Sequence, residues 1–369
     1  MRFSYSDDQE ALRQGARRFL EAHAPSARVR RAADGDGFDA ELWRRASAEL
    51  GWPALTIAEA HGGAGLGAVE LSALLEETGR ALAPIPLFST VCLGATPIAL
   101  GGTPAQQAAH LPRIAEGTVA TLALAEADGR WDTTAVHARA HATASGFRLD
   151  GRKSMVPDGH LADLFLVAAR TGAALELFLV EKDAPGLERR LLPGLDRTRR
   201  FAELTLTAVP AERLGHAGTG ARTLARTLDR AAIALGAEQV GAAERCLDLA
   251  VDYAKTRQQF GRAIGSFQAV KHRLADVFVA VESARSALYY ASFAASVDDP
   301  ELPVLAAVCK ATCSEAFFRA AADSIQVHGG IGFTSEHDAH LYFKRARASQ
   351  ALFGSPADRL ERVAAHLEL

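Results

Sequence analysis

Arg257 stands just before the pair Phe260 and Gly261, at the point where a long helical pattern should end. An arginine beside a glycine turn can hold a phosphate through two parallel hydrogen bonds. A neighbouring phenylalanine can pack against an adenine ring. An arginine near a helix end is, however, more often a cap for the last carbonyl groups. The residue types therefore leave two interpretations open, a nucleotide contact and a helix cap.

A second segment of chemical interest is Gln326-Val-His-Gly-Gly-Ile-Gly332. Its three glycines in four positions would let the backbone approach a ligand closely and present several N–H donors. Gln326 adds an amide that can both donate and accept. A helix end followed by a turn would explain one glycine, but it explains three close together less well.

The cysteines and the overall charge exclude other classes of site. Cys309 and Cys313 lie four residues apart, but no nearby histidine or cysteine completes a zinc set, so all four cysteines are expected to be reduced thiols in helical cores. With 23% charged residues and a net charge of -3, the chain lacks the basic excess of a nucleic-acid-binding protein. Its polar start and the absence of a long apolar run predict a cytoplasmic protein outside the membrane.

The elements that must position these residues follow the order helical, β, helical. Glycine, proline and aspartate separate short apolar or alternating runs between residues 118 and 212, which is typical of a β-barrel or sandwich of about a hundred residues. Long alanine-rich helical patterns follow and predict a four-helix bundle. We therefore expect an α+β chain with an N-terminal helical domain (1–117), a middle β domain (118–212) and a C-terminal four-helix bundle (213–369).

Individual elements are predicted by periodicity and turn signals. Helices are expected from Ser6 to Leu20, Glu41 to Leu50, Ala68 to Leu82, Thr90 to Leu100, Pro104 to Glu116, Ala221 to Tyr253, Gln268 to Ser296, Pro303 to His328 and Ser335 to Leu352. Strands are expected from Thr121 to Ala125, Val136 to Thr143, Gly146 to Gly151, Leu164 to Ala169, Leu175 to Val180 and Phe201 to Leu206. The glycine-rich run His61 to Gly67 follows no strand, so it is interpreted as a structural turn before a helix.

Taken together, the two motifs and this architecture resemble the acyl-CoA dehydrogenase family. The similarity is most specific in Tyr253-Ala-Lys-Thr-Arg-Gln-Gln-Phe-Gly261 and its continuation to Asp276, and in Gln326 to Tyr342. It extends over nearly the whole chain and includes the Gly-Gly-Ala-Gly-Leu-Gly loop that ends at Gly67. The chain is therefore identified as a member of this family by resemblance.

The resemblance implies a homotetramer or heterotetramer with FAD at subunit interfaces. It implies that Arg257, Phe260, Gln268, Gln326, Gly329 and Gly330 contact the FAD of a neighbouring subunit. It also implies that a carboxylate removes the α-proton of an acyl-CoA, that flavin N5 accepts the β-hydride, and that electron-transfer flavoprotein reoxidises the flavin. Each of these statements is an expectation from the family.

The sequence departs from the family at both positions of the catalytic base. The usual glutamate, in a Tyr-Glu-Gly-Thr run, aligns with Phe353, and phenylalanine cannot accept a proton. The alternative position on the long helix is Ala231. Asp229 close by matches an acid that contacts the pantetheine arm of the substrate in relatives, whereas the arginine expected three residues later is Ala232.

The predicted β domain has also lost family residues. The family's Thr-Glu-Pro-x-x-Gly-Ser-Asp run appears as Ala125-Glu-Ala-Asp-Gly-Arg-Trp-Asp132, and its Trp-Ile-Thr-Asn run appears as Met155-Val-Pro-Asp158. The threonine hydroxyl and the tryptophan face that touch the flavin ring are therefore missing, and Pro157 has no backbone N–H.

Three hypotheses follow. The favoured one is a partner subunit, as in some actinobacterial heterotetramers, in which this chain contributes the FAD contacts and a homologous subunit contributes the base. The second is a self-sufficient dehydrogenase with a relocated base, for which Glu126, Asp158 and Asp229 are weak candidates. The third is a flavin-free structural or acyl-CoA-binding protein. The sequence does not name the acyl group.

Overall fold

The structure is a computed structural model that describes residues 4–144 and 146–368. Contacts within the chain concentrate in two compact units. The first contains residues 1–31, 68–83 and 232–369, and the second contains residues 32–67 and 84–231. The three-domain division expected from the sequence stays a prediction.

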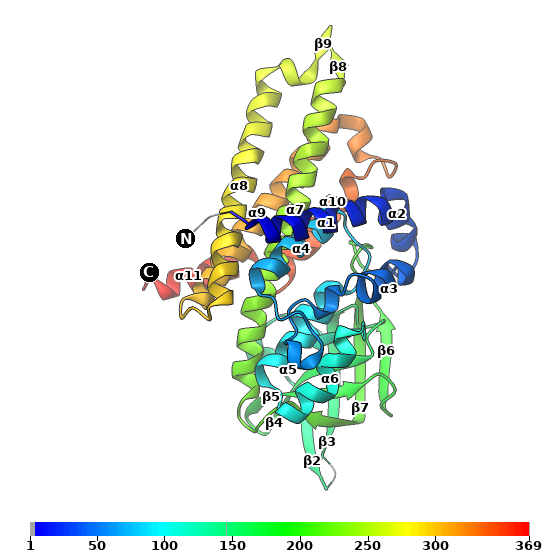
Figure 1. Cartoon of the computed structure of the whole chain (residues 1–369), viewed down its shortest axis with the longest axis vertical. Coiled ribbons are helices and arrows are strands. Elements are labelled where there is room, and N and C mark those ends of the chain that lie inside the picture. Colours follow the sequence, from blue (N-terminus) through cyan, green and yellow to red (C-terminus); the bar gives the residue numbers. More distant parts are fainter. Residues whose placement is uncertain (1–3, 145, 369) are drawn as a thin grey trace. The chain divides into compact units, whose positions relative to one another are not determined.

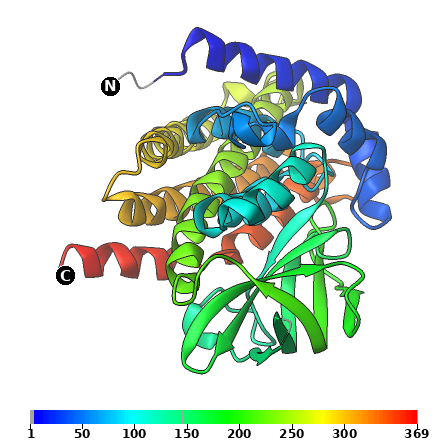
Figure 2. The same ribbon diagram turned by 60° about the horizontal axis from the view of Figure 1, so that its bottom comes forward.

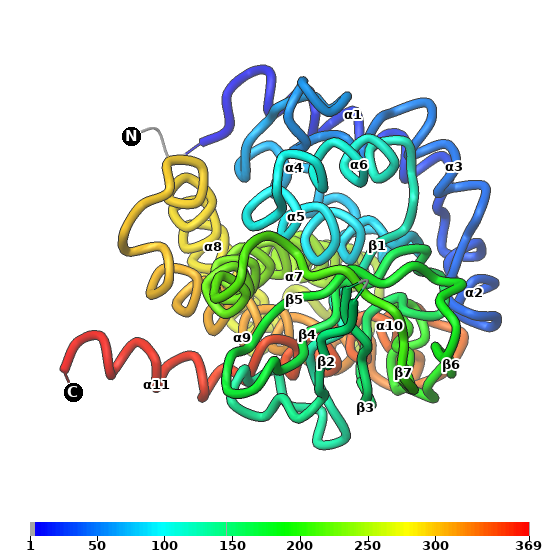
Figure 3. Tube along the Cα trace, turned by 90° about the horizontal axis from the view of Figure 1, so that it is seen from below, coloured from blue at the N-terminus to red at the C-terminus, as the bar shows by residue number. Residues whose placement is uncertain are grey.

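The first unit is helical, and Figures 1 and 3 show its helices α8 and α9 side by side. Its helices are α1 (Asp7–His23), α4 (Ala68–Arg80), the greater part of α7 (Gly220–Thr256), α8 (Gln268–Ser296), α9 (Leu302–His328), α10 (Ala339–Ala351) and α11 (Pro356–His366), and α2 (Ser26–Asp34) begins in it. A hairpin of β8 (Gln258–Gln259) and β9 (Arg262–Ala263) joins α7 to α8 through the turn η5 (Ile264–Ser266), and η6 (Gly329–Phe333) follows α9. The predicted C-terminal bundle is confirmed.

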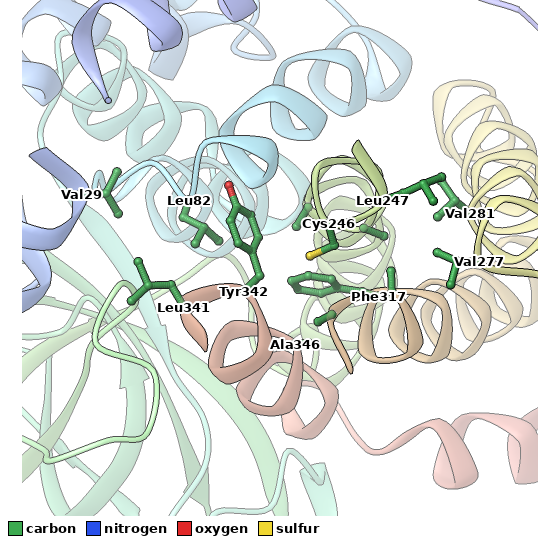
Figure 4. Close-up of a cluster of buried hydrophobic side chains, with 14 residues drawn as sticks. Val29, Leu82, Cys246, Leu247, Val277, Val281, Phe317, Leu341, Tyr342 and Ala346 are labelled. Carbon is green, nitrogen blue, oxygen red and sulfur yellow. The ribbon is translucent and has the colours of Figure 1, made fainter. Parts of the chain in front are cut away.

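Small and apolar side chains form the core of this bundle. Phe317 of α9, Cys246 of α7, Val281 of α8 and Tyr342 of α10 meet in one buried cluster (Figure 4). The helices approach closely where α7 carries glycine, because a Cβ at Gly241 would lie 1.8 Å from the carbonyl oxygen of Glu76. The alanine-rich composition of the bundle thus serves close helix packing.

A buried ionic network, which the sequence analysis did not identify, links α1, α4, α7 and α8. Glu76 of α4 accepts hydrogen bonds from Tyr5 (2.5 Å) and Arg285 (2.5 Å), and Arg285 also contacts Glu244 (3.0 Å). Arg17 holds Glu77 through two parallel bonds of 2.9 and 2.8 Å. Such buried charges are tolerated because each is paired.

The second unit is built on a seven-stranded sheet, seen at the lower right of Figure 2. Its strands are β1 (Ala120–Ala123), β2 (Arg139–Thr143), β3 (Gly146–Pro157), β4 (Leu164–Thr171), β5 (Ala174–Glu181), β6 (Leu187–Leu191) and β7 (Phe201–Arg213). The strand order is β1-β4-β2-β3-β7-β5, and β4 also pairs with β5, which closes the ring. Of the two predicted forms, the structure is therefore the barrel.

Helices and turns complete the second unit. They are α3 (Ala40–Ala48), η1 (Trp52–Ala54), η2 (Glu59–His61), the π-helix η3 (Ser89–Ala95), α5 (Thr96–Gly101), α6 (Pro104–Ala115) and η4 (Thr133–Ala135). The glycine-rich loop is structural, as predicted, because a Cβ at Gly63 would lie 1.9 Å from the Ile57 carbonyl oxygen.

Two predicted elements were wrong in form. The strand expected to end at Gly151 continues to Pro157, because Gly151 (φ 146°) lies at a bulge where the register against β7 shifts. The helix expected from Thr90 to Leu100 begins as the π-helix, in which Thr96 N–H bonds to the Val91 carbonyl. Pro97 cannot donate the next α-helical hydrogen bond, which favours this wider turn.

Two further expectations concern the cysteines and the ability of helices to cross a membrane. All four cysteines are reduced and buried, as predicted. Over residues 4–144 and 146–368, the helices are too short or too polar to cross a membrane.

Candidate functional site: a nucleotide-binding tip and the flavin-ring positions

Arg257 and Phe260 lie on the exposed hairpin between α7 and α8. The α7 helix ends at Thr256, and Arg257 keeps a backbone bond to the Tyr253 carbonyl (2.8 Å) while its side chain is exposed. Phe260 and Gly261 both have positive φ (53° and 76°), which is the backbone of a type I′ hairpin turn. Phe260 is 91% exposed, so the chain's own core does not account for an aromatic residue there.

The second motif lies at the end of α9. Gln326 is exposed, and Gly329 ends the helix with φ 60°. A Cβ at Gly330 would meet no atom of the described chain within 4 Å, and Gly330 does not have positive φ. In contrast, a Cβ at Gly332 would lie 2.8 Å from the Ile325 carbonyl oxygen. Gly332 is therefore required by the fold, whereas nothing in the described chain requires a glycine at Gly330.

A small core holds the two motifs together. Ala250 and Ala254 of α7 pack with Val327 of α9, and Ile264 and Val270 pack against them. Gln268, the first residue of α8, is exposed beside this core. We call the exposed set the bundle tip; its members are Arg257, Phe260, Gln268, Gln326, Gly329 and Gly330. All six residues predicted to bind the cofactor thus lie at the ends of elements that share one core.

Three stacked rings, not identified from the sequence, connect the same elements. The ring of Tyr253 lies 4.5 Å from that of His328, which lies 4.2 Å from that of His337. His328 is buried, and its Nδ1 contacts the Ser324 carbonyl (2.7 Å). Tyr253 is one helical turn before Arg257, and His328 directly precedes Gly329, so the stack fixes the spacing of the two motifs. The signal in the sequence was an aromatic ring beside each motif.

The position expected for the catalytic base is buried in the helical unit. Phe353 is 1% exposed and has φ 59°, and its carbonyl oxygen accepts a hydrogen bond from Arg359. Ser355, whose hydroxyl the family would retain, instead caps α11 and accepts the N–H of Asp358 (3.2 Å). The turn after α10 therefore serves the chain's own folding.

A buried lysine secures the helix that leads into this turn. Lys310 of α9 donates to the carbonyl of Gln350 (3.0 Å) near the end of α10 and to Ser314 Oγ (2.9 Å). Burial, together with the nearby charge of Arg359, lowers the pKa of Lys310 to about 7. Lys310 thus donates a hydrogen bond to the backbone on the N-terminal side of Phe353.

The alternative base position is also apolar. Ala231 and Ala232 are fully buried in α7, and Asp229 is buried two residues before Ala231. Neither alanine can accept a proton, so the sequence interpretation of these positions agrees with their surroundings.

Glu126, the first relocated-base candidate, has a structural role in the barrel. Its carboxylate accepts the N–H groups of His137 and Ala138 (both 2.9 Å) and the ammonium of Lys153 (2.8 Å). Burial raises the pKa of Glu126, but Lys153 and the two N–H groups outweigh this effect and hold the pKa below its usual value. A carboxylate stabilised in this way is a poor proton acceptor. The sequence signal for this structural role of Glu126 was Lys153, a charged residue in the strand that continues past Gly151, and it was overlooked.

Asp158, the second candidate, is likewise engaged. Its carboxylate accepts the hydroxyl of Ser89 (2.6 Å), and its backbone N–H bonds to the Arg200 carbonyl (2.9 Å). Pro157, directly before it, is buried and its carbonyl accepts Thr121 Oγ1 (2.7 Å). Around the strand end where a flavin ring would need donors, the polar groups therefore bond to the barrel itself. The flavin-ring positions are defined as Ala125, Met155 and Pro157.

Comparison with known proteins agrees with this architecture. Family models match residues 6–118 (acyl-CoA dehydrogenase, N-terminal domain), 121–209 (middle domain) and 218–368 (C-terminal domain). Acyl-CoA dehydrogenase IpdE2 of Mycobacterium tuberculosis is 37% identical over 363 residues, which cover 97% of this chain and 96% of the relative.

Solved structures are also similar. A variant of the Tcur3481-Tcur3483 steroid ACAD is 35% identical, with a TM-score of 0.89 over 98% of each chain. The ChsE4-ChsE5 complex of Mycobacterium tuberculosis is 29% identical, with a TM-score of 0.91 over 100% of this chain and 99% of the other. The chain belongs to the acyl-CoA dehydrogenase family of oxidoreductases.

Proposed function

We propose that this chain is the partner subunit of a hetero-oligomeric acyl-CoA dehydrogenase, in which it lacks the catalytic base and completes the FAD site of a homologous catalytic subunit. The observation that carries the proposal is Phe353, buried at the position where the family has its glutamate. The reaction would be the α,β-dehydrogenation of an acyl-CoA thioester, and FAD, when bound, would accept the hydride from the β-carbon.

The bundle tip fits the nucleotide half of FAD. The exposed guanidinium of Arg257 has five N–H donors in a planar fork suited to the pyrophosphate. Gly329 and Gly330 leave their backbone open to close approach, since a Cβ at either would meet nothing within 4 Å. Gln268 and Gln326 supply exposed amides, and the exposed ring of Phe260 can cover an adenine face.

The flavin-ring positions of this chain fit the cofactor poorly. Ala125 and Met155 provide no hydroxyl or tryptophan face, and Pro157 provides no N–H. The carboxylates of Glu126 and Asp158 are already bonded within the barrel. This contrast supports a chain that binds FAD seated in another subunit.

Two of the similar structures suggest what kind of protein the partner is. The Tcur3481-Tcur3483 steroid ACAD and the ChsE4-ChsE5 complex are each named after two proteins. By analogy, the partner of this chain would be a homologous subunit that retains the glutamate, and electron-transfer flavoprotein would reoxidise the complex. A steroid-derived acyl-CoA is the first substrate to test, on the strength of the first of these relatives.

The test is to purify the chain alone and together with each glutamate-bearing acyl-CoA dehydrogenase of the same organism. Flavin absorbance and acyl-CoA-dependent dye reduction are then measured for each preparation. We expect flavin and activity only in a mixed complex. Flavin and activity in the chain alone would instead support the self-sufficient dehydrogenase, and the absence of flavin from every preparation would support a flavin-free acyl-CoA-binding protein.

A further inference from the structure

A concavity lies in the helical unit and is bordered by α1, α2, α4, α7 and α10. Its volume is about 220 Å³. The side chains of Leu20, Val29, Leu82 and Leu341 are buried and form an apolar floor, whereas Glu21 and Ser26 are exposed and mark the mouth. Figure 4 shows Val29, Leu82 and Leu341 on one side of the ring of Tyr342. The concavity thus has an apolar floor beneath walls that carry charged side chains.

Most charges on its walls neutralise one another. Arg17 is paired with Glu77 (2.8 Å), and Arg80 is paired with Glu244 (3.2 Å) and Asp248 (2.6 Å). Asp338 at the mouth is paired with Arg30 (2.6 Å). These pairs need no further ligand, because each charge already has a partner of opposite sign.

Arg245 is a lining cation without such a partner among the described residues. It lines the concavity and is half-buried, and within residues 4–144 and 146–368 no carboxylate forms an ion pair with it. The guanidinium lies near the Tyr342 hydroxyl, which donates its hydrogen to the Arg80 carbonyl (2.7 Å). A guanidinium carries five N–H donors, which can bind an incoming anion.

We propose that this concavity binds a small aliphatic monocarboxylate. The carboxylate pairs with Arg245 near the phenol of Tyr342, and the alkyl chain lies against Leu20, Val29 and Leu82. Planar Arg–carboxylate pairing provides two parallel hydrogen bonds, which a neutral ligand cannot form. The volume is below the roughly 300–1,000 Å³ of drug-sized pockets and suits a short-chain acid.

The site is separate from the positions that resemble the dehydrogenase site. Tyr342 and Leu341 belong to the first turn of α10, whereas Phe353 follows its last residue, Ala351. A helix of this length spans about 20 Å. The proposal does not depend on flavin binding, and it stands or falls separately from the partner-subunit proposal.

The test is isothermal titration calorimetry of the full-length chain with sodium hexanoate. Hexanamide and inorganic phosphate serve as comparison probes, because one lacks the charge and the other lacks the alkyl chain. We expect hexanoate to bind and both comparison probes to bind at least about tenfold more weakly, since each loses one of the two interactions. No binding of hexanoate, or equal binding of hexanamide or phosphate, would overturn the proposal.

Variants locate the ligand. Arg245→Gln should weaken hexanoate binding about tenfold or more, because it removes the unpaired charge. Ala81→Leu should block the same space with the charge intact, and Glu21→Gln should tighten binding by removing a negative charge at the mouth. Arg319→Gln, in an exposed ion pair with Asp276 elsewhere, is the matched control. Unchanged hexanoate binding in both Arg245→Gln and Ala81→Leu would place the ligand elsewhere and contradict the proposal.

Discussion

The bundle tip and the flavin-ring positions differ in what their residues do for the chain itself. At the tip, Arg257 and Phe260 are exposed, and a Cβ at Gly330 would meet nothing. At the flavin-ring positions, Pro157 is buried and its carbonyl accepts the Thr121 hydroxyl; Phe353, at the position of the family's base, is buried in its own unit. Exposed residues that the chain's own fold does not require are the ones expected to bind a ligand or another subunit. Residues that are buried or hydrogen-bonded within the chain are not available for such contacts.

The largest expected effect comes from placing a carboxylate at the position of Phe353. Phe353→Glu should destabilise the chain by on the order of 3–5 kcal/mol, because it places a charge in a site that is 1% exposed. Phe353→Leu should cost about 1–2 kcal/mol as the apolar control. Urea unfolding measures both. A stable Phe353→Glu variant that reduces dye with acyl-CoA on its own would show that a working pocket exists here.

A matched pair of glycines sharpens the comparison at the tip. Gly330→Val should leave the free energy of unfolding unchanged, because no atom of the described chain crowds it, yet it should weaken FAD binding in the mixed complex about tenfold or more. Gly332→Ala should destabilise the chain, since its Cβ would press on the Ile325 carbonyl and on His328. Equal losses of stability in the two variants would mean that Gly330 is also a packing residue.

The candidate bases of the barrel provide a third test. Glu126→Gln should lower stability by about 1–3 kcal/mol because it leaves the buried Lys153 ammonium without its partner charge. In the mixed complex, kcat and its pH profile should not change, and the same holds for Asp158→Asn. Steady-state dye reduction across pH gives the answer. Loss of the alkaline rise in kcat for either variant would identify a relocated base in this chain.

The smallest effect concerns pH and the turn that contains Phe353. The folded pKa of Lys310 is about 7, below its ordinary value of 10.5. Between these values the unfolded chain binds more protons, so the free energy of unfolding should rise with pH above 7. Lys310→Met should reduce that rise between pH 7 and 9 by about 1–2 kcal/mol, and Lys182→Met, an exposed control, should not. An unchanged pH dependence in Lys310→Met would contradict the assignment.

The long alanine-rich helices and the alternating strands were predictable because hydrophobic periodicity determines them directly. β6 was missed because Leu187–Leu191 is mostly charged and exposed, and it pairs only at the edge with β7. The short helices α2 and α11 were also missed. Both helices are amphipathic, but they have only nine and eleven residues, so the pattern repeats over too few turns to be recognised in the sequence.

Part of the candidate site was likewise predictable from the sequence, and part was not. The six tip residues could be named because their types and spacing are unusual, and the loss of the glutamate was visible at Phe353. What the sequence could not show is which polar groups the chain would satisfy by itself. The Glu126–Lys153 pair, the stack of Tyr253, His328 and His337, and the ionic network around Glu76 join residues far apart in the chain.

The measurement that tests the account most directly is FAD retention by mixed complexes in which the arginine of one subunit at a time is replaced. The account predicts that Arg257→Ala in this chain removes FAD, whereas replacement of the homologous arginine in the catalytic partner leaves FAD bound. Retained FAD with Arg257→Ala in this chain, together with loss on changing the partner's arginine, would contradict it, because the flavin would then sit in this chain's own pocket.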